Sequence, residues 1–403
     1  MSAARPLPAR PLVHGMGPKV VEPDWAPLTD LEVDAVLARY PGLAAQHGDP
    51  APGIVWRSPR PMSAGALVRC RDAVVFVKRH DQRVRTAAQL SVEHTLADHL
   101  LANGVPVPVV LRTVAGESSV TWGDSVYEVH EVADGVDLYR DAMSWEPFTS
   151  LGHARAAGAA LARLHVAAAG FDQPPRAPGV LTNSCDVVTA RDPIEQVGRL
   201  LDQRPGLARY LAQRPWQDEL ARYHVPVIRR VAPLLAALRP QWGHGDWHPS
   251  NLAWTSARPD AEVEAVFDLG LANRTFAAHD LAVALERSTV SWLDLAETGQ
   301  AEANLDAVDA LLDGYEATRP LGSAELAALA EVLPVVHMEY ALSEIEYFAD
   351  VVRSESNADL AYTTYLVGHT RWFEGDDGSA LLTWLRRRAV ASGRGAPHCR
   401  SRT

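Results

Sequence analysis

The sequence predicts an α+β protein in which a small lobe, built from an antiparallel sheet and one main helix, precedes a larger and mostly helical lobe. Between residues 53 and 132, short runs of β-branched residues alternate with turn residues, a pattern typical of strands. Beyond residue 134 the apolar residues recur mostly with the period of an α-helix. We therefore expect a flexible, proline-rich tail over residues 1–27, a small lobe over 28–133 and a larger lobe over 134–403.

Composition and charge exclude several classes of protein. The 50 acidic residues exceed the 38 basic ones, so the net charge is −12, whereas a protein that wraps nucleic acid carries a basic face. The three cysteines lie far apart and form no C-x-x-C pair, which suits a reducing cytoplasm. No uninterrupted apolar run reaches the length of about 18 residues that a membrane helix needs. We expect a cytoplasmic protein without a nucleic-acid or membrane partner.

The small lobe begins with a predicted helix over residues 28–40, which Thr29 or Asp30 caps and Pro41 ends. A second helix is expected over residues 85–102, because its leucines follow a helical period and Asn103-Gly104 closes it. Runs of β-branched and aromatic residues predict five strands, over residues 54–56, 66–68, 74–77, 107–111 and 126–132.

In the larger lobe the helical period predicts seven helices, over residues 148–169, 194–211, 216–238, 281–297, 301–318, 335–353 and 359–373. One strand-like region interrupts them. There, residues 252–254 and 263–267 are expected to pair across a polar turn. This hairpin follows directly after the segment of the chain that is richest in reactive side chains.

That segment runs from His244 to Asn251 and reads H-G-D-W-H-P-S-N. Asp246 and Asn251 lie in a loop just before one strand of the hairpin, and Asp268 ends the other strand. Because a hairpin brings its two ends together, three oxygen-bearing side chains can converge there. Carboxylate and amide oxygens are ligands that Mg²⁺ prefers when it also binds phosphates, and the remaining carboxylate is free to orient or deprotonate a hydroxyl group.

The segment resembles the H-G-D-x-H-x-x-N signature of the aminoglycoside phosphotransferase and choline kinase-like family, a branch of the protein-kinase-like fold. The resemblance implies an enzyme that moves the γ-phosphate of ATP or GTP to a hydroxyl of a small molecule, such as an aminoglycoside, an amino sugar or an amino alcohol. It implies that Asp246 is the catalytic base and that Asn251 and Asp268 hold Mg²⁺. The residues implied to support the loop are His244, His248 and Asp280.

The small lobe carries a second part of the same pattern. Lys78 ends a predicted strand, as the V-A-I-K lysine of kinases does, and Glu93 follows in the only main helix of the lobe. Only Lys78 and Lys19 are lysines among the 38 basic residues, which suggests that a compact point charge is needed at residue 78. We expect Lys78, paired with Glu93, to bind the α- and β-phosphates of the nucleotide.

Residues 130–135 resemble the hinge of the family, where backbone groups of Glu131, Val132 and Ala133 would pair with adenine. The loop that covers the phosphates is expected near residues 58–67. Ser63 and Gly65 are its candidate backbone contacts, but two prolines make it a poor glycine-rich loop. This departure leaves ATP and GTP as alternatives.

The acceptor is expected to be small, because only 12 residues separate Asp268 from Asp280 and no protein-kinase activation segment fits between them. An acidic stripe on the helix over residues 335–353 could hold an amine-bearing acceptor, and a solvated helix face is the alternative. The candidate acceptor residues are Glu339, Glu346 and Asp350 of this stripe, together with Trp247 of the loop.

Two other functions are compatible with parts of the pattern. His244, Asp246 and His248 alternate along an extended segment and could form the metal site of a hydrolase. That interpretation leaves Lys78 and Asn251 without a purpose. A catalytically inactive, kinase-like binding protein is the other alternative, and it predicts that a catalytic residue is missing, whereas every residue of the implied set is present.

Overall fold

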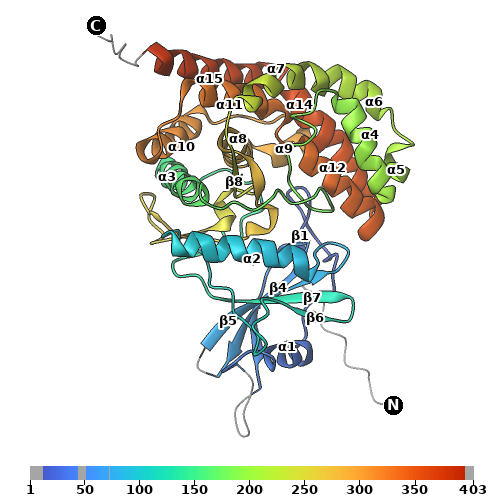
Figure 1. The fold of residues 1–403 in the computed structure, drawn as a ribbon, viewed down its shortest axis with the longest axis vertical. Coiled ribbons are helices and arrows are strands. Elements are labelled where there is room, and N and C mark those ends of the chain that lie inside the picture. Colours follow the sequence, from blue (N-terminus) through green and yellow to red (C-terminus); the bar gives the residue numbers. More distant parts are fainter. Residues whose placement is uncertain (1–11, 44–50, 72, 395–403) are drawn as a thin grey trace. The chain divides into compact units, whose positions relative to one another are not determined.

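The computed structural model describes residues 12–43, 51–71 and 73–394, and the chain forms two compact units. The first unit comprises residues 1–91 and 109–132, and the second comprises residues 92–108 and 133–403, masked positions apart. The predicted α+β class is confirmed, since a small antiparallel sheet is followed by many helices (Figure 1). The boundary differs from the predicted one because helix α2 (Ala87–Ala102) begins in the first unit and continues in the second.

The first unit is built on a five-stranded antiparallel sheet with the strand order β3-β4-β5-β7-β6. Helix α1 (Asp30–Leu37), which Thr29 caps, packs its apolar face on the sheet in one hydrophobic core. A separate strand pair, β1 (Val13–His14) with β2 (Val20–Val21), lies within the predicted tail. The strands of the main sheet are β3 (Gly53–Arg57), β4 (Ala64–Cys70), β5 (Ala73–Asp81), β6 (Val120–Trp122) and β7 (Ser125–Glu131).

The strand predicted over residues 107–111 is wrong. Within that range only Val110 forms a bridge, to His130 of β7. Pro108 has no amide hydrogen to donate to a ladder, so the segment runs beside β7 with only a few backbone hydrogen bonds, from Leu111 to Val129 and from Glu131 to Val109.

The second unit is mostly helical and includes two strand pairs. The pairs are β8 (Pro240–Gly243) with β11 (Asn273–Phe276) and β9 (Leu252–Trp254) with β10 (Val263–Val266). The α-helices are α3 (Leu151–Ala168), α4 (Pro193–Gln203), α5 (Pro205–Leu211), α6 (Trp216–Glu219), α7 (Val225–Ala236), α8 (Ala277–Thr289), α9 (Trp292–Thr298), α10 (Leu305–Thr318), α11 (Ser323–Val332), α12 (Met338–Glu346), α13 (Glu355–Leu360), α14 (His369–Trp372) and α15 (Asp376–Arg394). Short 3₁₀ or π-helical turns are η1 (Leu220–His224), η2 (Pro249–Asn251), η3 (Leu269–Leu271), η4 (Leu333–Val335), η5 (Tyr347–Val351) and η6 (Ala361–Gly368).

A proline accounts for one difference from the predicted helices, and short strand length accounts for a strand pair that was not predicted. The helix expected over residues 194–211 is broken at Arg204, because Pro205 begins a new helix and cannot donate its own amide. The β8–β11 pair was not predicted, since each strand has only four residues and its partner lies far along the chain. The hairpin of β9 and β10 was predicted correctly.

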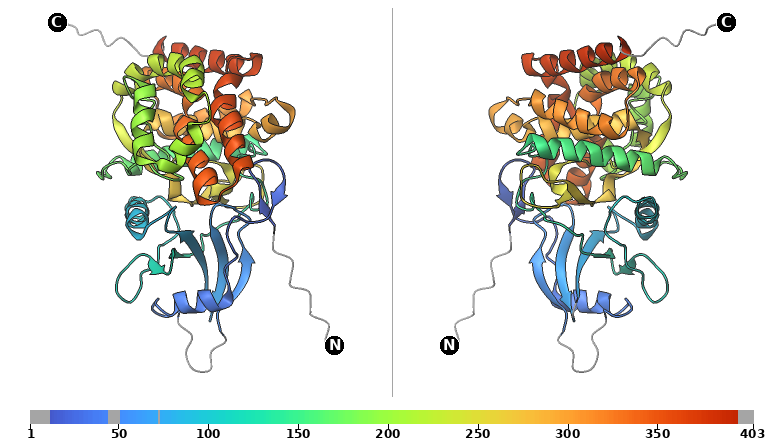
Figure 2. Two further views of the ribbon diagram at one scale, coloured as in Figure 1. Left: turned by 90° about the vertical axis from the view of Figure 1, so that its right-hand side faces the viewer. Right: turned by 90° about the vertical axis from the view of Figure 1, so that its left-hand side faces the viewer.

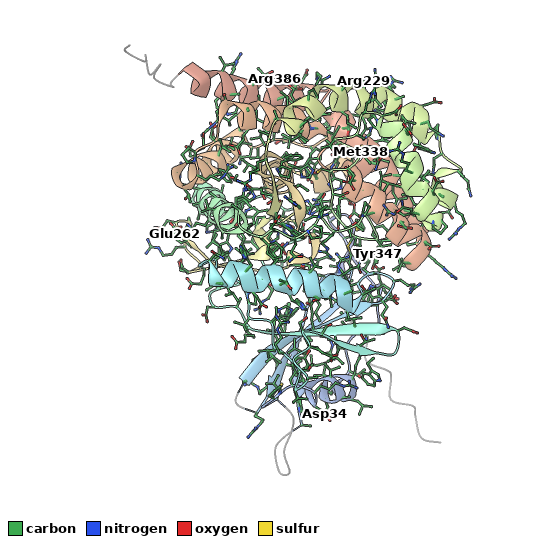
Figure 3. All side chains as sticks on the ribbon, in the orientation of Figure 1. Asp34, Arg229, Glu262, Met338, Tyr347 and Arg386 are labelled. Atoms are coloured by element: carbon green, nitrogen blue, oxygen red, sulfur yellow. The ribbon has the colours of Figure 1, made fainter. Side chains whose placement is uncertain are left out.

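One helical stretch, Ser323–Val351, is long and apolar enough to cross a membrane, but 89% of its most apolar window is buried within the protein. Met338 and Tyr347 of this stretch have almost no exposed surface, whereas Arg229 and Arg386 lie on exposed faces of α7 and α15 (Figure 3). Burial of this kind is typical of the core helix of a globular unit, and the stretch lies in the core of the second unit.

Helices α3 and α10 lie side by side in close contact (Figures 1 and 2). Gly158 of α3 faces the carbonyl oxygen of Leu311, and Gly314 of α10 faces that of Arg155, so an added methyl group at either glycine would collide with backbone. The two glycines therefore set the distance between the helices.

We expect Gly158→Ala to lower the free energy of unfolding by about 1–3 kcal/mol, because the helices must separate to admit the methyl group. Chemical denaturation monitored by circular dichroism measures the change. Gly198→Ala in α4 is the matched control, since a methyl group there meets no atom within 4 Å. That control should stabilise the protein by about 0.5–1 kcal/mol, and equal effects at the two positions would contradict the packing argument.

Candidate active site

The loop over residues 244–251 connects β8 to η2 and β9 in the second unit. Gly245 has a φ of 74°, and a Cβ atom at this position would collide with the carbonyl oxygen of Leu271. Only glycine meets both conditions without strain. After this turn the chain passes through Asp246, Trp247 and His248 into η2.

Asp280, near the start of α8, holds the first part of the loop. Its carboxylate accepts hydrogen bonds from the backbone N–H groups of His244 (2.8 Å) and Gly245 (2.7 Å). A third bond comes from His165 Nε2 (2.8 Å). Burial alone would raise the pKa of Asp280, but the hydrogen bond and charge of His165 outweigh burial and lower the pKa to about 2. The buried carboxylate is therefore ionised and fixes the backbone of the loop.

Asp246 is paired with a residue that the sequence did not single out. Arg287, in the last turn of α8, donates a hydrogen bond from Nη1 to Asp246 Oδ1. His248 Nε2 lies 3.5 Å from the same oxygen, and Asn251 Nδ2 lies 3.2 Å from Oδ2. Burial alone would raise the pKa of Asp246, but the charge of Arg287 and then that of His248 hold the pKa well below its usual range. An ionised carboxylate of this kind can accept a hydrogen bond from a hydroxyl group.

Arg287 is itself enclosed. Its side chain is 1% exposed, and its guanidinium carbon lies 4.8 Å from the ring centre of Tyr340 and 5.2 Å from that of Trp145. Arginine over an aromatic face gains cation–π attraction, which is strongest where water is excluded. The two aromatic rings and the carboxylate of Asp246 together fix the position of the guanidinium group.

Asn251 and Asp268 lie at neighbouring ends of the β9–β10 hairpin. Leu252 pairs with Val266 in the ladder, and the N–H of Phe267 donates to the carbonyl of Asn251 at 3.1 Å. Asn251 Nδ2 donates to the carbonyl of Asp246 (2.9 Å), so its amide oxygen is the atom left for a cation. Asp268 is exposed and has a φ of 60°. An amide oxygen beside an exposed carboxylate is a donor set that fits Mg²⁺.

A segment without regular structure supports the other side of the loop. Asn183 Nδ2 donates to the carbonyl of Gly245 (3.0 Å), and Asn273 Nδ2 donates to the carbonyl of Asn183 (2.7 Å). Arg176 Nη1 donates to the carbonyl of Gly270 (2.8 Å) and lies 3.9 Å from Glu93 Oε2. Sequence reasoning missed Arg176 and Asn183, because residues 174–190 show no periodic pattern.

The two histidines of the loop form hydrogen bonds to the loop itself and to the neighbouring strand end. His244 Nε2 donates to the carbonyl of Phe267 (3.1 Å), and its Nδ1 accepts from the N–H of Asp246 (3.2 Å). His248 Nδ1 lies 3.0 Å from Ser250 Oγ. Among the residues that the structure describes, the groups with three closely spaced metal-ligating atoms do not include His244, Asp246 and His248. The geometry gives no support to the hydrolase alternative.

The acidic residues proposed for the acceptor have partners in the same unit. Glu346 accepts a hydrogen bond from Arg204 Nε (2.6 Å), and Asp350 pairs with Arg209. Trp247 is fully buried. Glu339 is buried too, and it accepts hydrogen bonds from Ser184 Oγ and from the backbone N–H groups of Val187 (2.8 Å) and Val188 (3.2 Å).

We expect Glu339→Gln to flatten the dependence of stability on pH. Burial raises the pKa of Glu339 to about 7 from an ordinary value of 4.5, with its hydrogen bonds opposing the shift. The folded state therefore holds a proton that the unfolded state releases, and the stability present below pH 4.5 is lost as the pH rises through 7. The loss amounts to about 3 kcal/mol by pH 8.

Denaturation midpoints measured between about pH 4.5 and pH 8 test this expectation. The exposed Glu355→Gln is the matched control and should leave the curve parallel to that of the wild type. A Glu339→Gln curve with the wild-type slope would show that this carboxyl does not titrate in the window.

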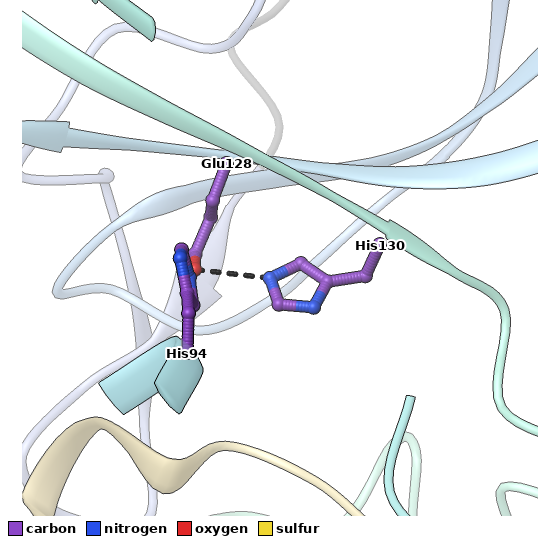
Figure 4. Close-up of side chains that lie close together, drawn as sticks. All are labelled: His94, Glu128 and His130. Atoms are coloured by element: carbon purple, nitrogen blue, oxygen red, sulfur yellow. Dashed lines mark hydrogen bonds and ion pairs between the residues drawn. The ribbon is translucent and has the colours of Figure 1, made fainter. Parts of the chain in front are cut away.

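In the first unit, Lys78 lies on β5 and is half-buried, with Gly65 of β4 opposite on one side and Glu128 of β7 on the other. Glu128 accepts a hydrogen bond from His80 Nε2 (2.8 Å). It accepts another from His130 Nε2 (2.9 Å), which Figure 4 shows. Gly65 faces the ring of Phe76 closely enough that a Cβ atom there would lie 2.8 Å from it.

The other residues predicted to bind the nucleotide lie at the ends of strands or at the boundary of the first unit. Ser63 immediately precedes β4, and Glu131 is the last residue of β7. The backbone N–H of Glu131 donates to the carbonyl of Val109 (2.9 Å). Val132 closes the first unit and Ala133 belongs to the second. The pairing of Lys78 with Glu93 stays a prediction.

Comparisons with known proteins bear on this site. The chain is 30% identical over 254 residues to an uncharacterized protein of Deinococcus radiodurans, and the match covers 61% of this chain and 63% of that protein, less than two thirds of its length. It is 28% identical over 284 residues to a homoserine kinase of Azorhizobium caulinodans, covering 69% of this chain and 75% of that protein. A solved structure of amicoumacin kinase hAmiN in complex with AMP-PNP, Ca2+ and Ami has a TM-score of 0.52 and 14% identity, covering 90% of this chain and 92% of that one.

The likeness to the solved structure shows a shared fold. The family model described as the phosphotransferase enzyme family matches residues 67–321, which is more than half of the chain and contains the loop with Asp246. The family resemblance inferred from the sequence is confirmed. This chain belongs to the phosphotransferase enzyme family.

Proposed function

We propose that this chain transfers the γ-phosphate of ATP or GTP to a hydroxyl group of a small molecule. The observation that carries the proposal is the ionised carboxylate of Asp246, held by Arg287 in a loop that Asp280 fixes. Membership of the phosphotransferase family supports this class of reaction. The likeness to a kinase structure with AMP-PNP and Ca2+ supports a nucleotide and a divalent cation as cofactors.

In this proposal Asn251 and Asp268 hold Mg²⁺, which supplies positive charge against the phosphate oxygens when it is bound. Lys78 binds the phosphates, and Glu93 keeps the supporting role that the resemblance implies. Backbone contacts to the nucleotide are assigned to Ser63 and Gly65 for the phosphates and to Glu131, Val132 and Ala133 for the base.

Asp246 accepts a hydrogen bond from the acceptor hydroxyl and aligns its oxygen with the γ-phosphorus. The oxygen forms a bond to phosphorus as the bond from phosphorus to the β,γ-bridging oxygen breaks, and the hydroxyl proton passes to Asp246. Because the pKa of Asp246 lies well below its usual range, this residue acts mainly by orientation and takes the proton late. Positioning and charge neutralisation supply most of the rate enhancement of phosphoryl transfer.

For the acceptor we propose an amino alcohol or a related small molecule, in a cytoplasmic setting. The homoserine kinase among the relatives supports this class. We propose that Glu339, Glu346 and Asp350 contact the amine of the acceptor. Trp247 of the loop is a further candidate for contact with the acceptor. Since each of the three carboxylates already has a partner in the chain, the amine has to share or displace that partner.

A panel of amino alcohols, hydroxy amino acids, sugars and aminoglycosides tests the proposal. The purified chain is incubated with ATP or GTP and Mg²⁺, and each acceptor is examined by mass spectrometry for one added phosphoryl group. We expect nucleotide-dependent phosphorylation of at least one hydroxyl compound. Nucleotide binding without phosphorylation of any acceptor would favour the inactive binding protein instead.

A further inference from the structure

A second cluster of potential ligands includes Glu286, the residue that precedes Arg287 in α8. Glu286 of α8, His337 just before α12 and His369 of α14 place their ligand atoms within 4.8 Å of one another, and all three are buried. Glu286 Oε1 lies 2.9 Å from His369 Nδ1 and 3.2 Å from His337 Nδ1. Ligands of a tetrahedral Zn²⁺ lie about 3.3 Å apart, given metal–ligand distances of about 2.0–2.1 Å. The carboxylate and the two imidazoles therefore have the spacing of a ligand set.

The cluster also gathers buried polar atoms that make no well-aligned hydrogen bond to the described residues, although His337 lies within ion-pair distance of Glu286 and Glu344. They are Glu286 Oε2, both ring nitrogens of His337, His369 Nε2 and both carboxylate oxygens of Glu344. Such atoms are few in native proteins, and each calls for an ion or water that satisfies it. Six such atoms on four neighbouring side chains mark a place where an ion or a water molecule is expected.

Glu344 lies where a carboxylate commonly supports a histidine ligand of a metal ion. Its Oε2 lies 3.6 Å from His337 Nε2, while His337 Nδ1 faces Glu286. A ligating imidazole commonly directs its second nitrogen to a carboxylate, which fixes the ring and raises its basicity. His369 is fixed differently, because Trp292 stacks on it at 3.9 Å between ring centres.

Charge balance points the same way. Arg287 pairs with Asp246 and lies 3.7 Å from Glu286 Oε2, so one guanidinium serves two carboxylates. Leaving a carboxylate buried and unpaired is costly. A divalent cation at Glu286 would supply the second positive charge. Without an ion His337 supplies it, because the effect of burial is outweighed by Glu286 and Glu344, which raise the pKa of His337 to about 9.

We propose that Glu286, His337 and His369 bind a divalent transition-metal ion, with Zn²⁺ as the best match to two imidazole nitrogens and one carboxylate. This site is separate from the Mg²⁺ ligands Asn251 and Asp268. The ion takes the place of the proton between His369 Nδ1 and Glu286 Oε1.

The test uses the full chain, expressed without a metal-affinity tag and stripped with a chelator. Zn²⁺ or Co²⁺ is then titrated in the presence of excess Mg²⁺. We expect one tightly bound ion per chain, a Co²⁺ ligand-field spectrum of low coordination number, and X-ray absorption fine structure that shows scattering from two imidazole rings. Substoichiometric binding, or a bound ion without imidazole scattering, would overturn the proposal.

Variants locate the ion. His337→Gln and His369→Gln should each weaken Zn²⁺ binding by more than about 100-fold. His224→Gln is the matched control, because His224 is a buried histidine outside the cluster that bonds to the carbonyl of Leu366; it should keep the ion, as should Asp268→Asn. Unchanged affinity in both cluster variants would reject the site. If they do not fold, the absorption spectrum of the wild-type chain decides.

Discussion

Asp246→Asn is expected to lower kcat by about 10²–10⁴-fold while the KM for ATP changes little. The amide cannot take a proton from the acceptor and carries no charge to align its hydroxyl. Nucleotide binding depends on other residues in the proposed function, so it should persist. Steady-state kinetics with the acceptor found in the panel, together with nucleotide titration, separates the two effects.

Asp260→Asn is the matched control for this variant. Asp260 is an exposed aspartate in the turn of the β9–β10 hairpin, which follows the loop of Asp246, and Arg258 pairs with Asp260 at 3.0 Å. Loss of this ion pair should leave kcat and KM at wild-type values, because an exposed ion pair contributes little to stability. A folded Asp246→Asn chain that turns over at the wild-type rate would remove Asp246 from the mechanism and leave the proposed reaction without its central residue.

The sequence predicted the parts of the site that depend on local order along the chain. Asn251 and Asp268 flank one hairpin, and a two-stranded pairing with a polar turn brings them together without further information. Asp280 was found only through the resemblance, since its contacts to the loop come from 35 and 36 residues away.

Arg287 was missed for a related reason. Its partner Asp246 is 41 residues away, and every residue of α8 is buried, so no apolar face singles out one side of that helix. Glu346 and Asp350 were assigned to a face by helical period, but the period cannot show that Arg204 and Arg209 approach from another helix. Long-range ion pairs are set by tertiary packing, which a single sequence does not encode in any periodic form.

Arg287→Met is expected to lower the free energy of unfolding by about 2–4 kcal/mol, because it leaves the carboxylate of Asp246, which is only 19% exposed, without its cation. It should also lower kcat, since Asp246 loses the group that fixes it. Methionine keeps most of the volume and the contacts with Trp145 and Tyr340. The exposed pair of Arg199 and Glu195, at 2.6 Å, supplies the control, and Arg199→Met should change stability by about 0.5 kcal/mol or less.

The double variant Asp246→Asn/Arg287→Met distinguishes a specific ion pair from general damage to the core. If Arg287 stabilises the fold through Asp246, removing both charges leaves neither group unpaired, and the double variant should be more stable than the sum of the single effects predicts, by about 1–3 kcal/mol. Simple additivity would mean that the two side chains act independently. In that case Arg287 would serve the packing of Trp145 and Tyr340 alone, and the position of Asp246 would have to come from Asn251 and the loop backbone.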